Sequence, residues 1–335
     1  MINASTNWKA KPFLLKPAGK DYLWGGNRLQ TEFNKELPLE PLAETWECST
    51  HPAGPSIIAS GIYEGMSLTQ LLAEHPEFLG THPGAEGELP ILIKFIDAKK
   101  DLSVQVHPTD EYAREHENGQ LGKTEMWYVM DAAPDAHLIY GFYHDIEKPQ
   151  LKESLENGTV EKYLQKIKIQ KDDVFLIEAG TVHAIGAGAL IAEIQENSNL
   201  TYRLYDYNRL DKNGKPRELH IKKALEVANL KGSAEPRQPL RLLKYKKGAA
   251  EEFLCRCKYF QVERYLLNTE SSRKLIEFQT DKNSFQVFLC LDGCGVIFME
   301  DGDSLNFFKG DCFFVPADSM KIRFHGKARF LKVQC

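Results

Sequence analysis

The sequence predicts a mainly β protein that forms two barrel-like domains with a few short helices. Short runs rich in Val, Ile, Phe and Tyr dominate the chain, turn residues separate these runs, and one turn–strand–turn pattern occurs twice. The strand-like runs in the N-terminal part are Ser56–Ala59, Ile91–Asp97, Leu102–Val106, Met126–Met130, His137–Phe142, Val174–Ile177, Ala189–Gln195 and Thr201–Tyr205.

Helical patterns are short and lie between the strand-like runs. Ser67 and Gln70 have the spacing of a capping box, which predicts a helix that continues through Glu74. A second helix is expected after Thr109. Further helices are expected at about Pro149–Asn157 (ended by Gly158), Thr159–Gln165 and Ile221–Asn229.

A linker separates the two predicted domains. The segment Lys231–Pro239 holds one glycine and two prolines and has no large apolar residue, which is typical of a connection between domains. We therefore expect an N-terminal catalytic barrel with helical connections over residues 1–235, and a second barrel over residues 240–335.

An internal repeat relates the two predicted barrels. The segment Lys171–His183 aligns with Lys309–Lys321, and each reads as a turn, a four-residue apolar strand and a second turn. In the second copy Lys321 takes the place of His183, and Gln286 takes the place of Glu125. A lysine at a ligand position repels a divalent cation, so we expect the C-terminal barrel to be metal-free and structural.

Composition excludes several classes of protein. The 335 residues carry a formal charge of −5, from 42 basic and 47 acidic side chains, which argues against a nucleic-acid surface. The sequence contains no run of 18 or more apolar residues, so we expect no membrane-spanning segment. Met1–Lys11 lacks the apolar core of a signal peptide. The seven cysteines lie mostly in apolar contexts, which predicts free thiols in a cytoplasmic protein. The oligomeric state stays open.

Two histidines and a glutamate form the candidate metal site. His107, Glu125 and His183 each lie in a strand or at its edge, so their side chains can point into one barrel from different strands. Two imidazoles and a carboxylate hold zinc and leave positions open for a substrate. Gln105 faces the same side as His107 by strand alternation; it is either a fourth ligand or a hydrogen-bonding group for substrate or metal-bound water.

Basic residues near these ligands indicate an anionic substrate. Lys123 is two residues before Glu125 and faces the same way on an extended chain. Arg203 lies in a strand-like run with little other charge, and Arg209 follows closely. A buried guanidinium needs an anionic partner, and phosphate oxygens match its fork. Together with a metal, these cations predict a phosphorylated, oxygen-rich small molecule.

At these residues the chain resembles type I mannose-6-phosphate isomerase of the cupin superfamily, in its short bacterial form. The resemblance covers most of the chain and is weaker in the last hundred residues. The matching motifs are Tyr22–Gly26, Glu44–Glu47, His51–Ser56, Ile93–Ala98, Leu102–Pro108, Gly122–Trp127, Gly180–Ile185 and Glu193–Arg209.

The resemblance implies two cupin-type jelly-roll barrels, one zinc ion per chain, and conversion of mannose 6-phosphate to fructose 6-phosphate. It implies that His107, Glu125, His183 and Gln105 are zinc ligands. Arg203 falls at the family's active-site arginine, and Lys123 is expected beside it as a second catalytic cation. Trp24, Ser103, Glu193 and Arg209 are expected to bind the hexose phosphate, although Arg209 stands where longer relatives carry a lysine. The helical insertion of those relatives is absent.

The expected reaction moves a proton between C1 and C2 through a cis-enediol. Glu193 is a candidate base; a metal-bound water or the surroundings of His107 are alternatives. Two other functions remain open at this point: a non-catalytic cupin that binds a sugar phosphate, and an iron-dependent cupin oxygenase.

Overall fold

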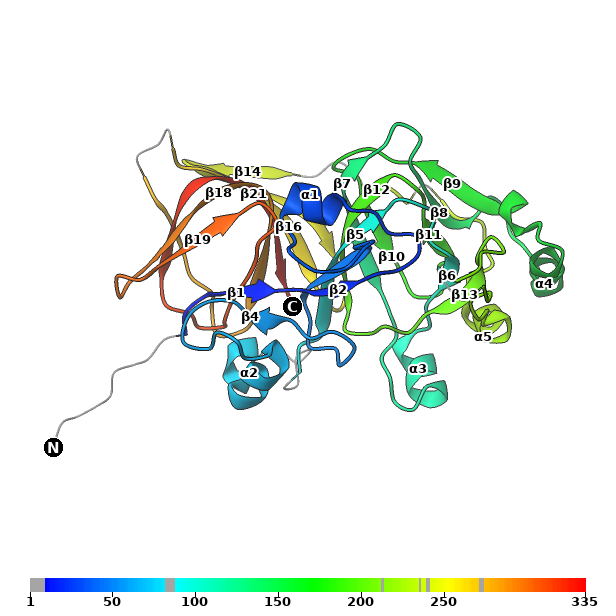
Figure 1. Ribbon diagram of the computed structural model, residues 1–335, viewed down its shortest axis with the longest axis horizontal. Coiled ribbons are helices and arrows are strands. Elements are labelled where there is room, and N and C mark those ends of the chain that lie inside the picture. Colours follow the sequence, from blue (N-terminus) through cyan, green and yellow to red (C-terminus); the bar gives the residue numbers. More distant parts are fainter. Residues whose placement is uncertain (1–9, 82–87, 212–213, 235, 239–241, 271–273) are drawn as a thin grey trace. The chain divides into compact units, whose positions relative to one another are not determined.

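The computed structural model describes residues 10–81, 88–211, 214–234, 236–238, 242–270 and 274–335. The contacts divide the chain into two compact units (Figure 1). The first unit comprises Met1–Pro17, Glu47–Pro90 and Leu240–Cys335, and the second comprises Ala18–Trp46 and Ile91–Pro239. Both are built from antiparallel strands, so the mainly β prediction is confirmed.

The second unit contains two antiparallel sheets. The six-stranded sheet has the order β10-β7-β12-β5-β3-β2, and the five-stranded sheet has the order β13-β6-β11-β8-β9. The strands of the first sheet are β2 (Ala18–Lys20), β3 (Glu44–Cys48), β5 (Ile91–Ala98), β7 (Glu125–Ala132), β10 (Val174–Ile177) and β12 (Ala189–Glu196). Those of the second are β6 (Val104–Val106), β8 (His137–Phe142), β9 (Leu164–Lys168), β11 (His183–Ile185) and β13 (Tyr202–Tyr205).

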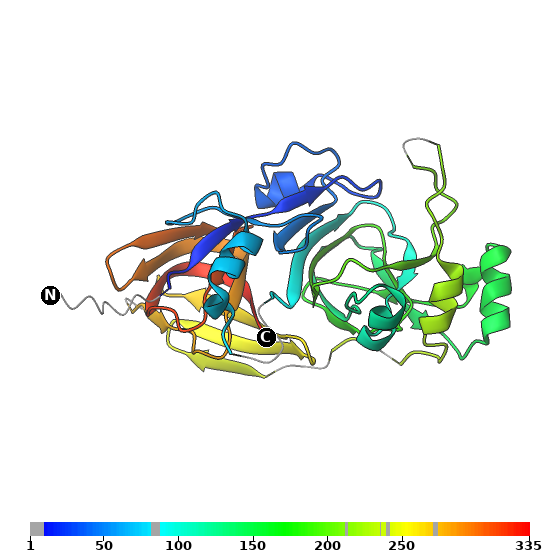
Figure 2. The same cartoon turned by 90° about the horizontal axis from the view of Figure 1, so that it is seen from below.

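The five-stranded sheet buries both of its faces. One face shares an apolar core with the six-stranded sheet, to which Leu138 and Ile185 contribute from one side and Ile96 and Val129 from the other. The opposite face packs on α4 (Lys148–Glu156) and α5 (Ile221–Val227), which lie side by side in both views (Figures 1 and 2). Because side chains alternate between faces, each strand of this sheet presents every second residue to the interior between the sheets.

Helix ends follow the capping signals. Ser67 caps α2 (Leu68–Glu74) by accepting a hydrogen bond from Gln70 N, and Thr109 caps α3 (Asp110–His116) in the same way. The helices predicted near α4 and α5 are also confirmed. Helix α1 (Arg28–Phe33) was not predicted.

The helix predicted at Thr159–Gln165 is wrong. A single 3-10 turn (Val160–Lys162) leads there directly into β9. Leu164 and Ile167 are buried, and β9 pairs with β8, so strand pairing and burial decide the local structure.

The first unit is one ten-stranded antiparallel sheet with order β14-β15-β16-β21-β18-β20-β1-β4, to which β17 and β19 add as branches. Its helical segments are α2 and a 3-10 turn at Pro76–Leu79. Its core is rich in phenylalanine, including Phe288, Phe313 and Phe324. The strands are β1 (Phe13–Lys16), β4 (Ile57–Ile58), β14 (Leu243–Lys246), β15 (Ala249–Arg256), β16 (Gln261–Asn268), β17 (Ile276–Phe278), β18 (Gln286–Met299), β19 (Ser304–Phe308), β20 (Cys312–Val315) and β21 (Ile322–Gln334).

The internal repeat has the same strand register in both units. β10 pairs with β7 so that Ile177 lies opposite Glu125. β20 pairs with β18 so that Val315 lies opposite Gln286, which is the equivalent position in the repeat. His183 is fully buried, whereas Lys321 is exposed. The two copies therefore share a backbone pattern and differ in what they place at the ligand positions.

The units are not contiguous in sequence. β1, dark blue in Figure 1, lies between β20 and β4, so N-terminal residues complete the sheet of the C-terminal segment. The contacts thus divide the chain differently from the continuous domains 1–235 and 240–335 that the sequence predicts, because β1 finds its hydrogen-bonding partner in β20. In the described part of the chain, every helix is too short or too polar to cross a bilayer.

Candidate metal centre and pocket

Strand register brings the candidate residues into two facing rows. In the five-stranded sheet Gln105 lies opposite His183 on one side and Arg203 on the other. In the six-stranded sheet Glu193 lies opposite Lys94 and Trp127. Neighbouring residues such as Val104, Val106 and Ala184 belong to the core on the helix-covered face, so alternation leaves the polar row pointing between the sheets.

His107, Glu125 and His183 meet in one buried cluster. Each contributes a ligand atom that lies within 4.8 Å of the other two. His107 Nε2 is 3.5 Å from Glu125 Oε2, and His183 Nε2 is 3.3 Å from Glu125 Oε1. Two donors bound to one tetrahedral ion at about 2.0–2.1 Å are roughly 3.3 Å apart. The spacing therefore suits a shared metal ion.

The protein holds both imidazoles in the orientation that a metal requires. His107 Nδ1 donates a hydrogen bond to Leu200 O, and His183 Nδ1 donates one to Thr181 O, each at 2.8 Å. These bonds place the ring proton on Nδ1 and leave the Nε2 lone pair directed at the cluster.

The charge states also suit a metal. Burial, followed by the nearby Lys123 ammonium, lowers the pKa of His107 to about 3, and burial lowers the pKa of His183. Burial alone would raise the pKa of Glu125, but Lys123 and His107 hold it well below its usual value. At neutral pH the cluster is thus two neutral imidazoles and one carboxylate.

The cluster leaves buried polar atoms without protein hydrogen bonds. Within the described residues, His107 Nε2 and both carboxylate oxygens of Glu125 have no hydrogen-bond partner. The Lys123 ammonium forms an ion pair with Glu125, with Nζ 2.7 Å from Oε2. Such atoms are costly to bury unless they are paired or coordinated to a metal. The residues present therefore fit a zinc ion by donor type, charge and spacing.

Gln105 lies at the edge of this cluster. Its amide Nε2 is 3.3 Å from His183 Nε2, and the side chain also lines the adjacent pocket. A half-turn of the amide places its oxygen at the same point, where it would face a cation. Its position suits either of the two roles that the sequence leaves open.

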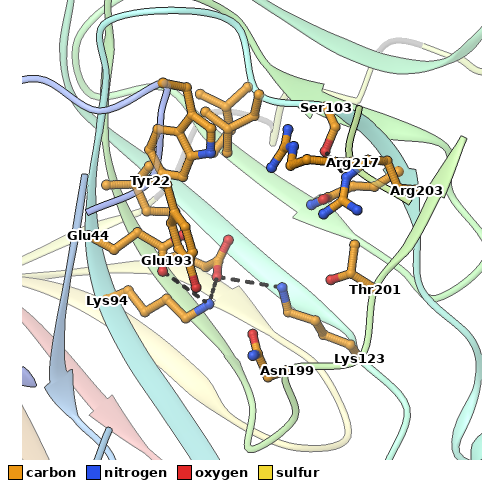
Figure 3. A pocket seen from close by; sticks show the side chains of 15 residues that line it. Tyr22, Glu44, Lys94, Ser103, Lys123, Glu193, Asn199, Thr201, Arg203 and Arg217 are labelled. Carbon is orange, nitrogen blue, oxygen red and sulfur yellow. Dashed lines mark hydrogen bonds and ion pairs between the residues drawn. The ribbon is translucent and has the colours of Figure 1, made fainter. Parts of the chain in front are cut away.

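A polar pocket of about 250 Å³ opens beside the cluster (Figure 3). This volume is below the range of about 300–1,000 Å³ for drug-sized ligands, which suits a smaller molecule. The lining residues are Tyr22, Trp24, Glu44, Lys94, Ile96, Leu102, Ser103, Gln105, Lys123, Ile185, Glu193, Asn199, Thr201, Arg203 and Arg217.

One end of the pocket is rich in carboxylates. Glu44 and Glu193 lie there with Lys94 between them, and Lys94 Nζ is 3.2 Å from Glu193 Oε1 (Figure 3). Trp127 Nε1 donates a hydrogen bond of 3.0 Å to Glu193 Oε2. Burial alone would lower the pKa of Lys94, but Glu44 and Glu193 raise it, so the ammonium stays charged. Glu193 is thereby held with Oε2 on Trp127 and with Oε1 beside the ammonium groups of Lys94 and Lys123.

Most residues predicted to bind the substrate or act on it line this pocket. Trp24, Ser103, Lys123, Glu193 and Arg203 all line it. The exception is Arg209, which is outside the described lining: its guanidinium bonds to Asp206 and to the backbone oxygen of Asp101.

Several lining residues were missed. Lys94 lies in the apolar run Ile91–Asp97, where a buried lysine needs acidic partners, so a signal for it was present in the sequence. Arg217 gives no such signal, because it lies in a polar loop outside every strand.

Glu196 supports the segment that carries Lys123 and leads into β7. Its Oε1 accepts a hydrogen bond of 2.6 Å from Thr124 N. Burial, followed by the charge of Asp110, raises the pKa of Glu196 from 4.5 to about 8. Between these two values the folded protein keeps a proton that the unfolded chain has released, so this group makes stability fall as pH rises.

Replacement of Glu196 by glutamine should remove this pH dependence, because the amide keeps the acceptor and does not ionise. From pH 5 to pH 8 we expect the free energy of unfolding of E196Q to rise, relative to that of the unchanged protein, by on the order of 1–2 kcal/mol. Urea unfolding of both proteins at the two pH values measures this difference. Stability curves that stay parallel would contradict the assignment.

The fold and this site define a class of protein: a barrel protein with a buried His–Glu–His cluster that could hold a metal ion, beside a charged pocket. Two family descriptions match the chain. Residues 13–138 match "Phosphomannose isomerase type I, catalytic domain", and residues 249–335 match "Mannose-6-phosphate isomerase, cupin domain".

Relatives match over most of their length. A putative mannose-6-phosphate isomerase of Bacillus subtilis, YvyI, is 39% identical over 314 residues, covering 91% of this chain and 93% of the relative. The mannose-6-phosphate isomerase ManA of the same organism is 40% identical over 267 residues, covering 79% and 82%.

Solved structures agree with these matches. A crystal structure of mannose 6-phosphate isomerase from Bacillus subtilis superposes with a TM-score of 0.88 at 36% identity, covering 97% of this chain and 99% of the other. A zinc-bound mannose 6-phosphate isomerase superposes with a TM-score of 0.74 at 17% identity, covering 97% of this chain and 99% of the other. At this identity the match supports the fold alone. This chain belongs to the type I phosphomannose isomerases, and its cupin fold is the one predicted from the sequence.

Proposed function

We propose that this protein is a zinc-dependent isomerase that interconverts mannose 6-phosphate and fructose 6-phosphate. The observation that carries the proposal is the position of the buried His107–Glu125–His183 cluster beside a pocket that combines a carboxylate, Glu193, with the cations Lys123 and Arg203. An aldose–ketose isomerisation needs these groups: a base for the proton and positive charge for the oxygens.

One zinc ion would be held by His107, Glu125 and His183, with Gln105 as a fourth donor. When bound, zinc supplies Lewis-acid polarisation of the sugar's carbonyl oxygen. The hydrogen bonds from His107 to Leu200 O and from His183 to Thr181 O would keep both ligands in place during turnover.

Glu193 would carry the proton between the two carbons. As a carboxylate it removes the proton from C2 of the open-chain aldose and returns it to C1, while the hydroxyl proton on O2 moves to O1. The cis-enediol is the intermediate, and the carbonyl moves from C1 to C2. Glu193 suits this role better than His107, because Glu193 lines the pocket and His107 is not among the lining residues.

The remaining lining residues would bind and orient the sugar. Lys123 Nζ lies 3.7 Å from Glu193 Oε1, so its ammonium can hold an oxygen of the sugar near the reacting carbons. Arg203 would stabilise negative charge on the substrate through the donors that its guanidinium keeps free for a ligand. Ser103 accepts a hydrogen bond of 3.2 Å from Arg203 Nε and so orients that guanidinium, and Trp24 provides an apolar wall.

A coupled assay for fructose 6-phosphate tests the proposal directly. We expect turnover of mannose 6-phosphate that falls at least about 100-fold after chelation and returns on addition of zinc. Elemental analysis of the untreated protein should find zinc. Binding of mannose 6-phosphate without turnover would indicate a non-catalytic binding protein, and iron together with oxygen consumption would indicate an oxygenase; either result would refute the isomerase.

A further inference from the structure

Three arginines gather around one buried carboxylate at the end of the pocket away from Glu44 and Glu193. Arg209 and Arg217 both bond to Asp206, and Arg203 lies close enough to Arg217 for the two charges to repel. Asp206 is 5% exposed. Burial alone would raise its pKa, but Arg217 and Arg209 hold it below its usual value, so the carboxylate is ionised. Three positive charges therefore face one buried negative charge.

The three guanidinium groups differ in how many donors they have left. Arg209 uses all three nitrogens: Nε bonds to Asp206 O, Nη1 to Asp101 O and Nη2 to Asp206 Oδ1. Arg217 uses only one edge, with Nε 2.7 Å from Asp206 Oδ2 and Nη2 2.6 Å from Asp206 Oδ1. Across the described residues, no side chain or backbone group accepts a hydrogen bond from Arg217 Nη1.

Arg203 also keeps donor capacity. Its Nε bonds to Ser103 Oγ and its Nη1 to Glu218 O at 2.8 Å, which leaves Nη2 without a hydrogen-bond acceptor in the described part of the chain. Arg203 and Arg217 both line the pocket, and Arg209 is outside the described lining. Figure 3 shows Arg203 and Arg217 together beside Ser103, and Lys94 and Glu193 at the opposite end. The two arginines that keep unused N–H donors, Arg203 and Arg217, are therefore the two that can bind a ligand in the pocket.

Electrostatics favours an anion at this point. Burial, and then the charge of Arg217, lowers the pKa of Arg203. An anion between the two guanidinium groups would relieve that repulsion, and it would be disfavoured at the other end, where Glu44 and Glu193 lie. The three terminal oxygens of a phosphate monoester match two partly used guanidinium forks.

We propose that Arg217 determines specificity for the phosphate group of the substrate, by binding it together with Arg203. Asp206 holds the fork of Arg217 in place through a bidentate ion pair, and Arg209 is a positioning residue that holds Asp206. This inference rests on the proposed isomerase function. It sets the direction of the sugar: the phosphate at C6 lies at the arginine end, and C1 and C2 lie near Glu193 and the metal cluster.

The test compares Arg217→Met with a matched control, Arg114→Met. Arg114 is a half-exposed arginine on α3, paired with Asp110 and outside the pocket. For R217M we expect KM for mannose 6-phosphate to rise about 10- to 100-fold, which corresponds to the loss of charge-assisted hydrogen bonds, with a smaller change in kcat. R114M should behave like the unchanged protein.

A second readout does not depend on turnover. Inorganic phosphate should raise the melting temperature of the unchanged protein and of R114M, and this rise should be lost in R217M. Arg217→Lys keeps a charge beside Asp206 and loses the fork, so it should fold as the unchanged protein does and still show the raised KM. It serves in place of R217M if removal of the charge prevents folding.

The outcomes separate this inference from the proposed function. An unchanged KM in the Arg217 variants, or stabilisation by phosphate that is equal in R217M and R114M, would overturn the role of Arg217 while leaving the isomerase intact. Absence of turnover in the unchanged protein would refute the function; loss of the phosphate effect in R217M would then still support the anion site.

Discussion

His183→Ala should abolish both zinc content and turnover. The imidazole is fully buried, and its Nε2 is 3.3 Å from Glu125 Oε1, so the variant removes one of the three donors that converge in the cluster. Loss of a ligand should weaken zinc binding more than the roughly 10- to 100-fold that loss of a ligand's supporting hydrogen bond causes. Elemental analysis measures the zinc, and the coupled assay measures the turnover.

An exposed histidine provides the matched control for this experiment. His116 lies in the last turn of α3 and stacks on Tyr112, away from the cluster. His116→Ala should retain zinc and activity. Glu125→Gln is a second variant of similar shape, and it should also lose zinc because it removes the only negative charge among the three donors. Full activity in metal-stripped His183→Ala protein would refute the metal role.

Arg203→Ala should lower kcat/KM for mannose 6-phosphate about 100- to 1,000-fold, the effect expected when one partner of a buried, hydrogen-bonded charge pair with the substrate is removed. Stability should change much less. The guanidinium bonds to Ser103 Oγ and Glu218 O, and the loss of such bonds costs about 1–2 kcal/mol. Steady-state kinetics and urea unfolding of the same preparation separate the two effects.

Arg203→Lys separates the effect of the charge from that of the planar guanidinium. It keeps a positive charge and loses the planar fork, so activity should lie between those of the unchanged protein and Arg203→Ala. Turnover that is unaffected by Arg203→Ala would remove this residue from the site. A fall in activity that only parallels a loss of folded protein would indicate a structural role.

Strand positions could be predicted because alternation and turn residues act locally. The run His137–Phe142 is strand β8 with the same bounds, and Val174–Ile177 is β10. The repeat was visible for the same reason: Glu125 and Gln286 begin equivalent strands, and the structure gives them equivalent partners, Ile177 and Val315.

Prediction failed where a distant partner decided the outcome. The sequence predicts a helix over Thr159–Gln165, but pairing with β8 makes the end of that segment the start of strand β9. β1 belongs to the sheet of the C-terminal segment because its hydrogen-bonding partner is β20, which lies some three hundred residues later.

The pocket shows the same limit. Arg209 and Arg217 are both arginines in the polar loop after β13, and no local pattern distinguishes them. Only the arrangement around Asp206 places Arg217 in the lining and Arg209 outside it.

The sequence by itself determined the chemistry that is available: two imidazoles, a carboxylate and nearby cations on strands, in a chain of mainly β character. The tertiary structure decided which of these groups meet, which nitrogens stay available, and where the pocket has its acidic and basic ends. The physical reason is how far apart along the chain the interacting residues lie. Side-chain alternation depends on neighbouring residues, whereas convergence of His107, Glu125 and His183 depends on the register between strands that lie far apart along the chain.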